Sequence, residues 1–198
     1  MPSLRSGTPQ SQALAVKKVV VEMIAKSELV SQLENAKNNY VLGLAAISLF
    51  SNEKTYPILN ESSASFGQYA LQFKQVSGLL NQSADREIAL KEFLTSQIRA
   101  LIKESFELIK DYCEGTNQNP SFKAEPWYQY ARIIRNCLSH NFRFEFNRHD
   151  KTFLPVAWKN RTIDSTMDGK NLKLEFFGYV ETWELFIEYQ GFVSNRLN

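Results

Sequence analysis

The sequence feature that most constrains the fold is a long amphipathic run between Ser83 and Gly115. Large apolar side chains recur in it at spacings of three and four, which is the repeat of one face of an α-helix. Ser83, followed closely by Glu87, is typical of a helix start, and Gly115 is typical of a helix end. The apolar positions are Ile88, Leu90, Phe93, Leu94, Ile98, Leu101, Ile102, Phe106, Leu108 and Ile109. The run therefore predicts one long helix with a wide apolar face toward the core.

Two further helical regions are predicted before this run. From Ser11 to about Ser51 the chain contains no proline, and its apolar positions recur at threes and fours, which predicts one long helix or two. A loop is expected at 51–63, where proline, serine and asparagine interrupt the pattern. Ser63 or Ser65 is then expected to cap a short helix that ends near Leu80.

A change in apolar spacing divides the remainder of the chain. After a loop at 116–126, the spacing predicts a fourth helix over 127–140, and helical spacing returns in a last helix over 179–197. Between these two helices, apolar and polar residues alternate in the manner of short strands. The alternating segments are 142–148, 152–163 and 171–177, with a turn expected at Asp168 and Gly169. The predicted fold class is mainly α, a helical bundle with a small antiparallel β-element, residues 142–176, before the C-terminal helix.

Length and composition indicate one globular domain. The chain has 198 residues, of which 43% are hydrophobic and 22% charged, and domains of about 100–200 residues commonly hold a single core. We expect one domain over residues 1–198, with residues 1–10 flexible. The net charge of +2 is too small to indicate nucleic-acid binding by the surface as a whole, so any basic site must be local.

The sequence shows no recognisable targeting or membrane-spanning segment. Its start is polar, and its longest apolar run, residues 41–50, is about half the length that a bilayer requires. The two cysteines, Cys113 and Cys137, are too few for a disulfide framework. These features predict a cytoplasmic protein without membrane contact.

A concentration of cations marks the predicted fourth helix. The stretch YARIIRNCLSHNFRF, Tyr130 to Phe144, contains three arginines and a histidine but no carboxylate. At about 100° per residue, one helix face is apolar and the opposite face is polar. The apolar face holds Trp127, Tyr130, Ala131, Ile134, Cys137 and Leu138, and the polar face holds Arg132, Arg135, Asn136, Ser139 and His140. Uncompensated guanidinium groups suit a phosphate, although a solvated face with a histidine at the helix C-terminus is the simpler alternative.

The residues Arg135, Asn136 and His140 resemble the Arg-Asn-x-x-x-His signature of HEPN domains, the higher eukaryotes and prokaryotes nucleotide-binding superfamily. The motif lies near the end of a helix that follows a long amphipathic helix, as in those all-helical bundles. A small β-element before the last helix is similar to one subgroup. The resemblance covers the motif helix and the C-terminal third, and it implies an HEPN-like bundle.

Many HEPN proteins are ribonucleases that need no metal or other cofactor, so the resemblance implies metal-independent cleavage of RNA. In that reaction the ribose 2′-OH attacks the adjacent phosphorus, with His140 as the group that transfers protons. Arg135 would stabilise charge on the phosphate oxygens, and Asn136 would orient the imidazole or hold the phosphate. The expected substrate-binding residues are Arg132, Ser139, Arg143 and Tyr128.

The family also implies a homodimer. Arg135 and His140 are five residues apart, about 140° apart around a helix, so one helix brings them together poorly. Two facing motif helices would form a cleft that contains two copies of each. HEPN toxins modified by nucleotidyltransferase antitoxins carry a tyrosine two residues after the histidine, where this chain has Phe142, so that neutralisation is not expected. A toxin or phage-defence role, with an antitoxin or another partner protein, rests on family analogy.

Several alternatives use the same residues. The polar face can instead belong to a non-catalytic HEPN module that binds a nucleotide or a protein. A glutamate of the long helix, Glu104, Glu107 or Glu114, can pair with Arg132 or Arg135, which makes the arginines structural. Cys137 with His140 has the spacing of a zinc or nucleophilic pair, with Cys113 and His149 as further ligands, but its predicted face buries the thiol.

Overall fold

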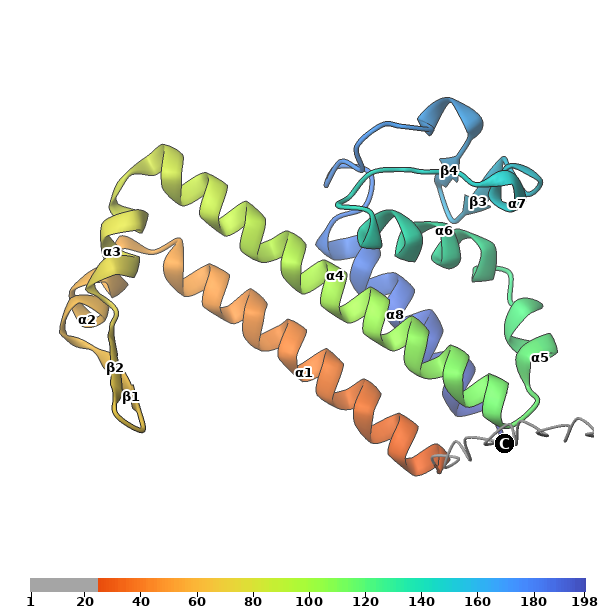
Figure 1. Ribbon diagram of the computed structural model, residues 1–198, viewed down its shortest axis with the longest axis horizontal. Coiled ribbons are helices and arrows are strands. Elements are labelled where there is room, and N and C mark those ends of the chain that lie inside the picture. Colours follow the sequence, from red (N-terminus) through yellow and green to blue (C-terminus); the bar gives the residue numbers. More distant parts are fainter. Residues whose placement is uncertain (1–24) are drawn as a thin grey trace, which may run out of the picture.

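The computed structural model describes residues 25–198, which form a mainly helical structure with two small antiparallel strand pairs (Figure 1). The helices are α1 (Lys26–Phe50), α2 (Tyr56–Glu61), α3 (Lys74–Asn81), α4 (Ser83–Gly115), α5 (Asn119–Lys123), α6 (Tyr128–Ser139), α7 (Arg148–Lys151) and α8 (Tyr179–Asn195). Two short 3-10 turns are η1 (Glu53–Thr55) and η2 (Ser165–Met167). The strands are β1 (Ser63–Phe66), β2 (Tyr69–Gln72), β3 (Val156–Trp158) and β4 (Arg161–Ile163). The predictions of a flexible 1–10 segment and of a helix start at Ser11 lie outside the described residues.

Helix α4 is the axis of the fold, and it begins and ends at the residues that the sequence predicts. Figure 1 shows α1 running alongside it, with α6 and α8 beside its C-terminal half. In that half Ile98, Leu101, Ile102, Phe106 and Ile109 are buried, whereas Ile88 near the other end is largely exposed. A helix of this length, about 50 Å at 1.5 Å per residue, extends beyond the core that it supports.

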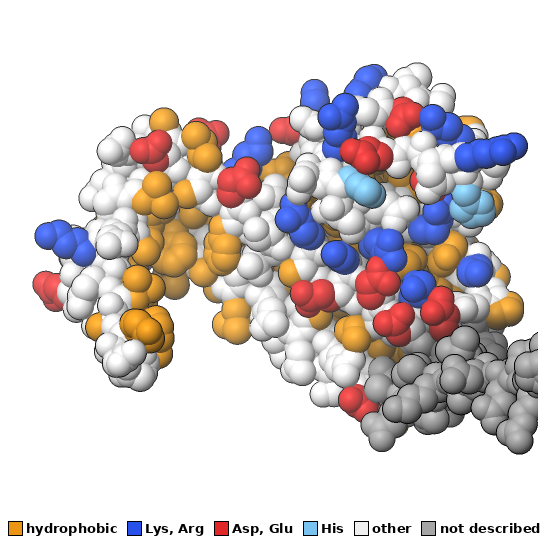
Figure 2. Space-filling view, in the orientation of Figure 1, with side chains coloured by type: hydrophobic (Ala, Val, Ile, Leu, Met, Phe, Trp, Pro, Cys, Tyr) orange, Lys and Arg blue, Asp and Glu red, His pale blue; other side chains and the backbone are white. Residues whose placement is uncertain are grey.

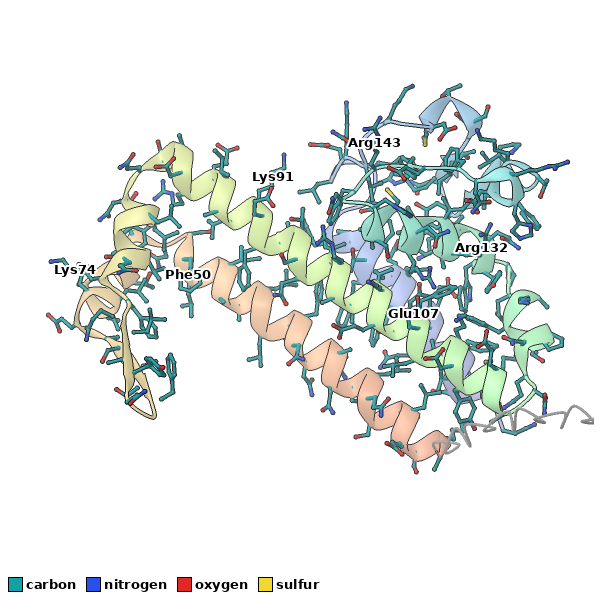
Figure 3. The ribbon with its side chains drawn as sticks, in the orientation of Figure 1. Phe50, Lys74, Lys91, Glu107, Arg132 and Arg143 are labelled. Atoms are coloured by element: carbon teal, nitrogen blue, oxygen red, sulfur yellow. The ribbon has the colours of Figure 1, made fainter. Side chains whose placement is uncertain are left out.

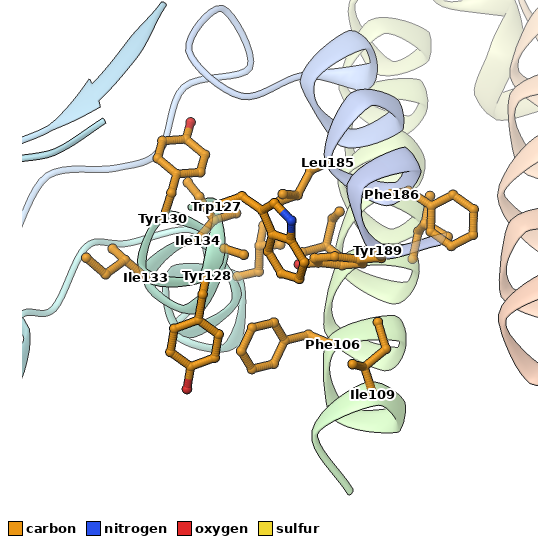
Figure 4. Close-up of a cluster of buried hydrophobic side chains, with 14 of the residues drawn as sticks. Phe106, Ile109, Trp127, Tyr128, Tyr130, Ile133, Ile134, Leu185, Phe186 and Tyr189 are labelled. Atoms are coloured by element: carbon orange, nitrogen blue, oxygen red, sulfur yellow. The ribbon is translucent and has the colours of Figure 1, made fainter. Parts of the chain in front are cut away.

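The core is densest around α6, where aromatic side chains from four helices meet (Figure 4). The Phe106 and Phe122 ring centroids lie 5.2 Å apart, and those of Trp127 and Tyr189 lie 5.1 Å apart. Aromatic pairs at these separations add attraction to the area that they bury. The predicted apolar face of α6 is confirmed, because Trp127, Tyr130, Ala131, Ile134, Cys137 and Leu138 are all buried. This packing fixes the orientation of α6 and therefore of the motif that it carries.

The β-element between α6 and α8 is smaller than predicted. Strands β3 and β4 form a two-stranded antiparallel pair, but 142–148 and 171–177 are not strands. Those segments touch through one bridge, Arg143 to Asn171, and the Phe144 N–H donates to the Lys170 carbonyl at 2.9 Å. The alternating pattern is interrupted because Asn147 and Asp150 cap the start of α7 at Arg148.

Residues 51–82 form an arm at the end of the molecule opposite α5 (Figure 1). The predicted helix from Ser63 or Ser65 to Leu80 is wrong for residues 63–72, which form the hairpin β1–β2 around Gly67 at φ +59°. Such a positive φ suits glycine in a tight turn. Only the last part of the prediction is helical, as α3. Figure 2 shows hydrophobic side chains gathered on this arm, and Phe66, Tyr69 and Leu71 of the hairpin are exposed.

Across residues 25–198, no helix is both long enough and apolar enough to cross a membrane.

Candidate functional site

The motif helix ends in an unusual turn. His140 follows the last residue of α6, and its N–H still donates to the Asn136 carbonyl at 3.0 Å. Asn141 and Phe142 then have φ values of 53° and 59°. Asparagine adopts this left-handed conformation readily, whereas a bulky aromatic residue does so at a cost. The turn reverses the chain and places His140 at the edge of a depression.

Three of the predicted site residues line this depression together. Asn136, His140 and Arg143 surround an open volume of about 620 Å³, which the loop residues complete. The remaining lining residues are Phe144, Glu145, Phe146, Asn147, Asp168 and Gly169. The His140 side chain is about half exposed (53%), and its Nδ1 lies 3.3 Å from Glu145 Oε2. Within residues 25–198, no hydrogen bond or ion pair engages the other ring nitrogen, Nε2.

Arg135 lies on the other edge of α6 and does not line the depression. Its guanidinium forms an ion pair with Glu107 of α4 and lies 5.4 Å from the Phe106 ring centroid. Arg135 Nη1 also donates to Asn136 Oδ1 at 2.7 Å, which orients the amide that lines the depression. The structure thus confirms that a glutamate of the long helix pairs with a motif arginine.

Arg132 also pairs with a carboxylate, but its partner is Asp150 and not a glutamate of the long helix. Its Nη1 lies 2.6 Å from Asp150 Oδ1, and both side chains are almost fully buried, at 14% and 2% exposed. Its guanidinium also lies 5.7 Å from the Phe153 ring centroid. Because its charge is already paired inside the protein, Arg132 is less available to a substrate phosphate than the sequence predicts. Figure 3 shows Arg132 well separated from Arg143.

Tyr128 and Ser139 also differ from expectation. Tyr128 is buried, with its ring centroid 4.9 Å from Phe122 and 5.9 Å from Phe106, so its ring has no face free to stack on a base. The Ser139 hydroxyl donates to the Arg135 carbonyl at 3.0 Å. Ser139 is exposed but lies outside the lining of the depression.

The fold supplies the carboxylates that the motif stretch lacks. Glu107, Asp150 and Glu145 lie beside Arg135, Arg132 and His140 in that order. Asp168 lines the same depression as His140, and hydrogen bonds from the Phe146 N–H and then from Lys151 lower the pKa of its carboxyl. Arg143 is exposed and forms no ion pair with any residue of 25–198. Sequence reasoning missed Glu145 and Asp168, although the Asp168-Gly169 turn signal marked the second of them.

The cysteine alternatives lose support. Cys113 and Cys137 are both buried, and burial raises the pKa of each thiol to about 12. A thiol with that pKa is not a nucleophile near neutral pH. No group of three or more histidine, cysteine or acidic side chains within residues 25–198 is arranged to hold a metal ion.

Comparison of the chain with protein-family models, with curated proteins and with solved structures gives no match.

Proposed function

We propose that this chain is a metal-independent endoribonuclease of the HEPN type. The observation that carries the proposal is the position of His140. It is half exposed at the edge of an open depression, beside Asn136 and Arg143, with Nδ1 held 3.3 Å from Glu145. A half-exposed histidine beside a carboxylate, at the edge of an open depression, suits general acid–base catalysis.

The proposed reaction is transesterification at one phosphodiester of RNA. His140 Nε2 takes the proton of the ribose 2′-OH, and the 2′-oxygen forms a bond to the adjacent phosphorus. The bond from phosphorus to the 5′-oxygen breaks, and that oxygen leaves with a proton from a second acid. The products carry a 2′,3′-cyclic phosphate and a 5′-hydroxyl. Arg143, exposed and without an ion pair in residues 25–198, is suited to hold a phosphate oxygen.

A second copy of the chain completes the proposed site. Arg135 is 23% exposed and is engaged with Glu107 on the other edge of α6 from the depression, so one chain does not bring its guanidinium to His140. Two motif helices facing each other let Arg135 of one chain stabilise the phosphate beside His140 of the other. One Arg135 and one His140 from opposite chains then make the reacting pair, and solvent water in the open depression is the acid for the leaving oxygen.

A non-catalytic module is the second candidate, and one observation favours it. Two of the three arginines in the motif stretch, Arg132 and Arg135, already have carboxylate partners. The depression would then hold a nucleotide or a protein segment without cleaving it. A toxin or phage-defence role, with or without an antitoxin, is a further proposal by family analogy.

RNA cleavage in excess EDTA tests the proposal. Wild type, Arg135→Ala, His140→Ala and the control His149→Ala are incubated with end-labelled single-stranded RNA. His149 is the other histidine, and its ring packs on Phe153. We expect 2′,3′-cyclic phosphate ends from wild type and His149→Ala, and at least a hundredfold less from the other two.

Two outcomes decide against the proposal. Equal cleavage by His140→Ala and wild type means that His140 does not carry the reaction. RNA binding without cleavage by wild type favours the non-catalytic module.

A further inference from the structure

A second groove lies on the other side of the turn that carries His140. Its volume is about 960 Å³, and it separates one face of α4 from the loops after α6 and before α8. Lys91 and Arg99 line it from α4, Asn141 and Phe142 from the turn, and Lys173 from the opposite loop. Figure 3 shows Lys91 and Arg143 on the same side of α4. Three cations therefore surround one groove next to the motif.

Arg99 has the chemistry of an anion-binding residue. It is partly buried, yet within residues 25–198 it forms no ion pair, whereas Arg132 and Arg135 each pair with a carboxylate. Its Nε is buried without a hydrogen-bond partner. A buried N–H donor without an acceptor is stabilised when an anion supplies one.

Phe142 holds this guanidinium in place. The Arg99 Cζ lies 5.2 Å from the Phe142 ring centroid, a distance typical of a cation–π contact. Phe142 makes this contact from a left-handed backbone conformation, φ 59°, that is costly for an aromatic residue. Phe142 also packs against the hydrophobic core, so it positions the unpaired Arg99 in the groove from a fixed support.

Two carboxylates reduce the charge of the groove lining from +3 to +1. Glu92 and Glu175 line it as well, but neither forms an ion pair with Lys91, Arg99 or Lys173. The three cations therefore remain available to a ligand with repeated negative charge.

The groove and the depression share one turn. His140 and Arg143 line the depression, and Asn141 and Phe142 between them line the groove. A polymer that places one phosphate at His140 passes over this turn to the groove. We propose that the groove around Arg99 binds the phosphodiester backbone of single-stranded RNA next to the cleaved bond. The choice of RNA rests on the function proposed above.

Binding of 2′-O-methyl RNA tests the groove separately from cleavage, because this RNA lacks the attacking hydroxyl. Fluorescence anisotropy compares wild type with Arg99→Gln and Arg99→Lys. Arg148→Gln is the matched control, since Arg148 is an exposed arginine outside the groove. We expect Arg99→Gln to weaken binding about tenfold and to reduce the slope of log affinity against log salt by about 0.7, the share of one phosphate. Arg99→Lys should lose less, and Arg148→Gln should match wild type.

Three outcomes overturn the groove proposal, and a fourth overturns only the function on which it rests. Unchanged affinity and salt slope in Arg99→Gln exclude Arg99 as a ligand. Absence of RNA binding by wild type excludes the groove as an RNA site. Adenosine monophosphate or inorganic phosphate is also added at the same concentration of phosphate groups as the RNA. Displacement of the RNA under these conditions makes the groove a site for a small anion. Groove-dependent binding without cleavage of unmodified RNA retains the groove and refutes the nuclease.

Discussion

At the scale of single residues, the environment of each arginine decides what it can do. Arg132 and Arg143 belong to the same polar stretch, but Arg132 is 14% exposed against a buried Asp150, whereas Arg143 is exposed and unpaired within residues 25–198. Removing one member of a buried ion pair leaves the other charge without compensation. Removing an exposed charge has little effect on stability.

Arg132→Ala is therefore expected to lower the free energy of unfolding by about 3 kcal/mol or more, because it leaves Asp150 buried and unpaired. Arg143→Ala is the matched control, with an expected change within about 0.5 kcal/mol. Urea unfolding followed by far-ultraviolet circular dichroism measures both. Equal stability of the two variants would contradict a structural role for Arg132 and return it to the list of free phosphate ligands.

At the scale of elements, Asp168 links the loop after α6 to the loop before α8. Its Oδ1 accepts a hydrogen bond from the Phe146 N–H at 3.0 Å, and its Oδ2 lies 2.9 Å from Lys151 Nζ. Both contacts favour the charged carboxylate, so the pKa of Asp168 falls below its ordinary value of 3.8. The ionised Asp168 side chain therefore stabilises the wall of the depression opposite α6 through these two contacts.

The sign of the resulting pH dependence follows from that lowered pKa. The stabilisation is complete above the unfolded-state pKa, near 3.8, and is lost as pH falls through the lower folded-state value. Asp168→Asn, which cannot ionise, should be less stable than wild type at neutral pH, and the difference should shrink below about pH 4. Urea midpoints of both proteins across this range provide the measurement. A difference that stays constant with pH would show that charge on Asp168 is not involved.

Individual elements differ in how well the sequence predicts them. Helix α4 was predicted to the residue because its repeat and its terminal residues are local properties of the chain. The hairpin β1–β2 was missed because its strands have four residues each, too few to distinguish an alternating pattern from a helical one. Glu107 could be named only as one of three candidate partners, and Asp150 was missed, since which carboxylate meets Arg135 or Arg132 depends on tertiary packing.

At the scale of the whole molecule, the proposed chemistry requires more than one chain. The Asn136 and His140 side chains line one depression, as their four-residue spacing on a helix allows. Arg135 faces Glu107 on α4 instead. The spacing argument made from the sequence anticipated this separation, and the fold preserves it. A nuclease built on this motif therefore combines groups from two copies of α6.

Mixing two inactive variants tests that requirement. Arg135→Ala retains His140, and His140→Ala retains Arg135, so a mixed dimer has one of each group on opposite chains. We expect each variant alone to cleave RNA at least a hundredfold more slowly than wild type, and the mixture to regain a measurable share of that activity after subunit exchange. Sedimentation velocity at the assay concentration verifies that dimers are present.

The double variant Arg135→Ala/His140→Ala, mixed with wild type in the same ratio, controls for dilution of wild-type dimers. Recovery only in the mixture of single variants requires Arg135 and His140 to act across the interface. No recovery, with dimers present, would place both groups of each working site in one chain, which requires Arg135 to leave Glu107 when RNA binds.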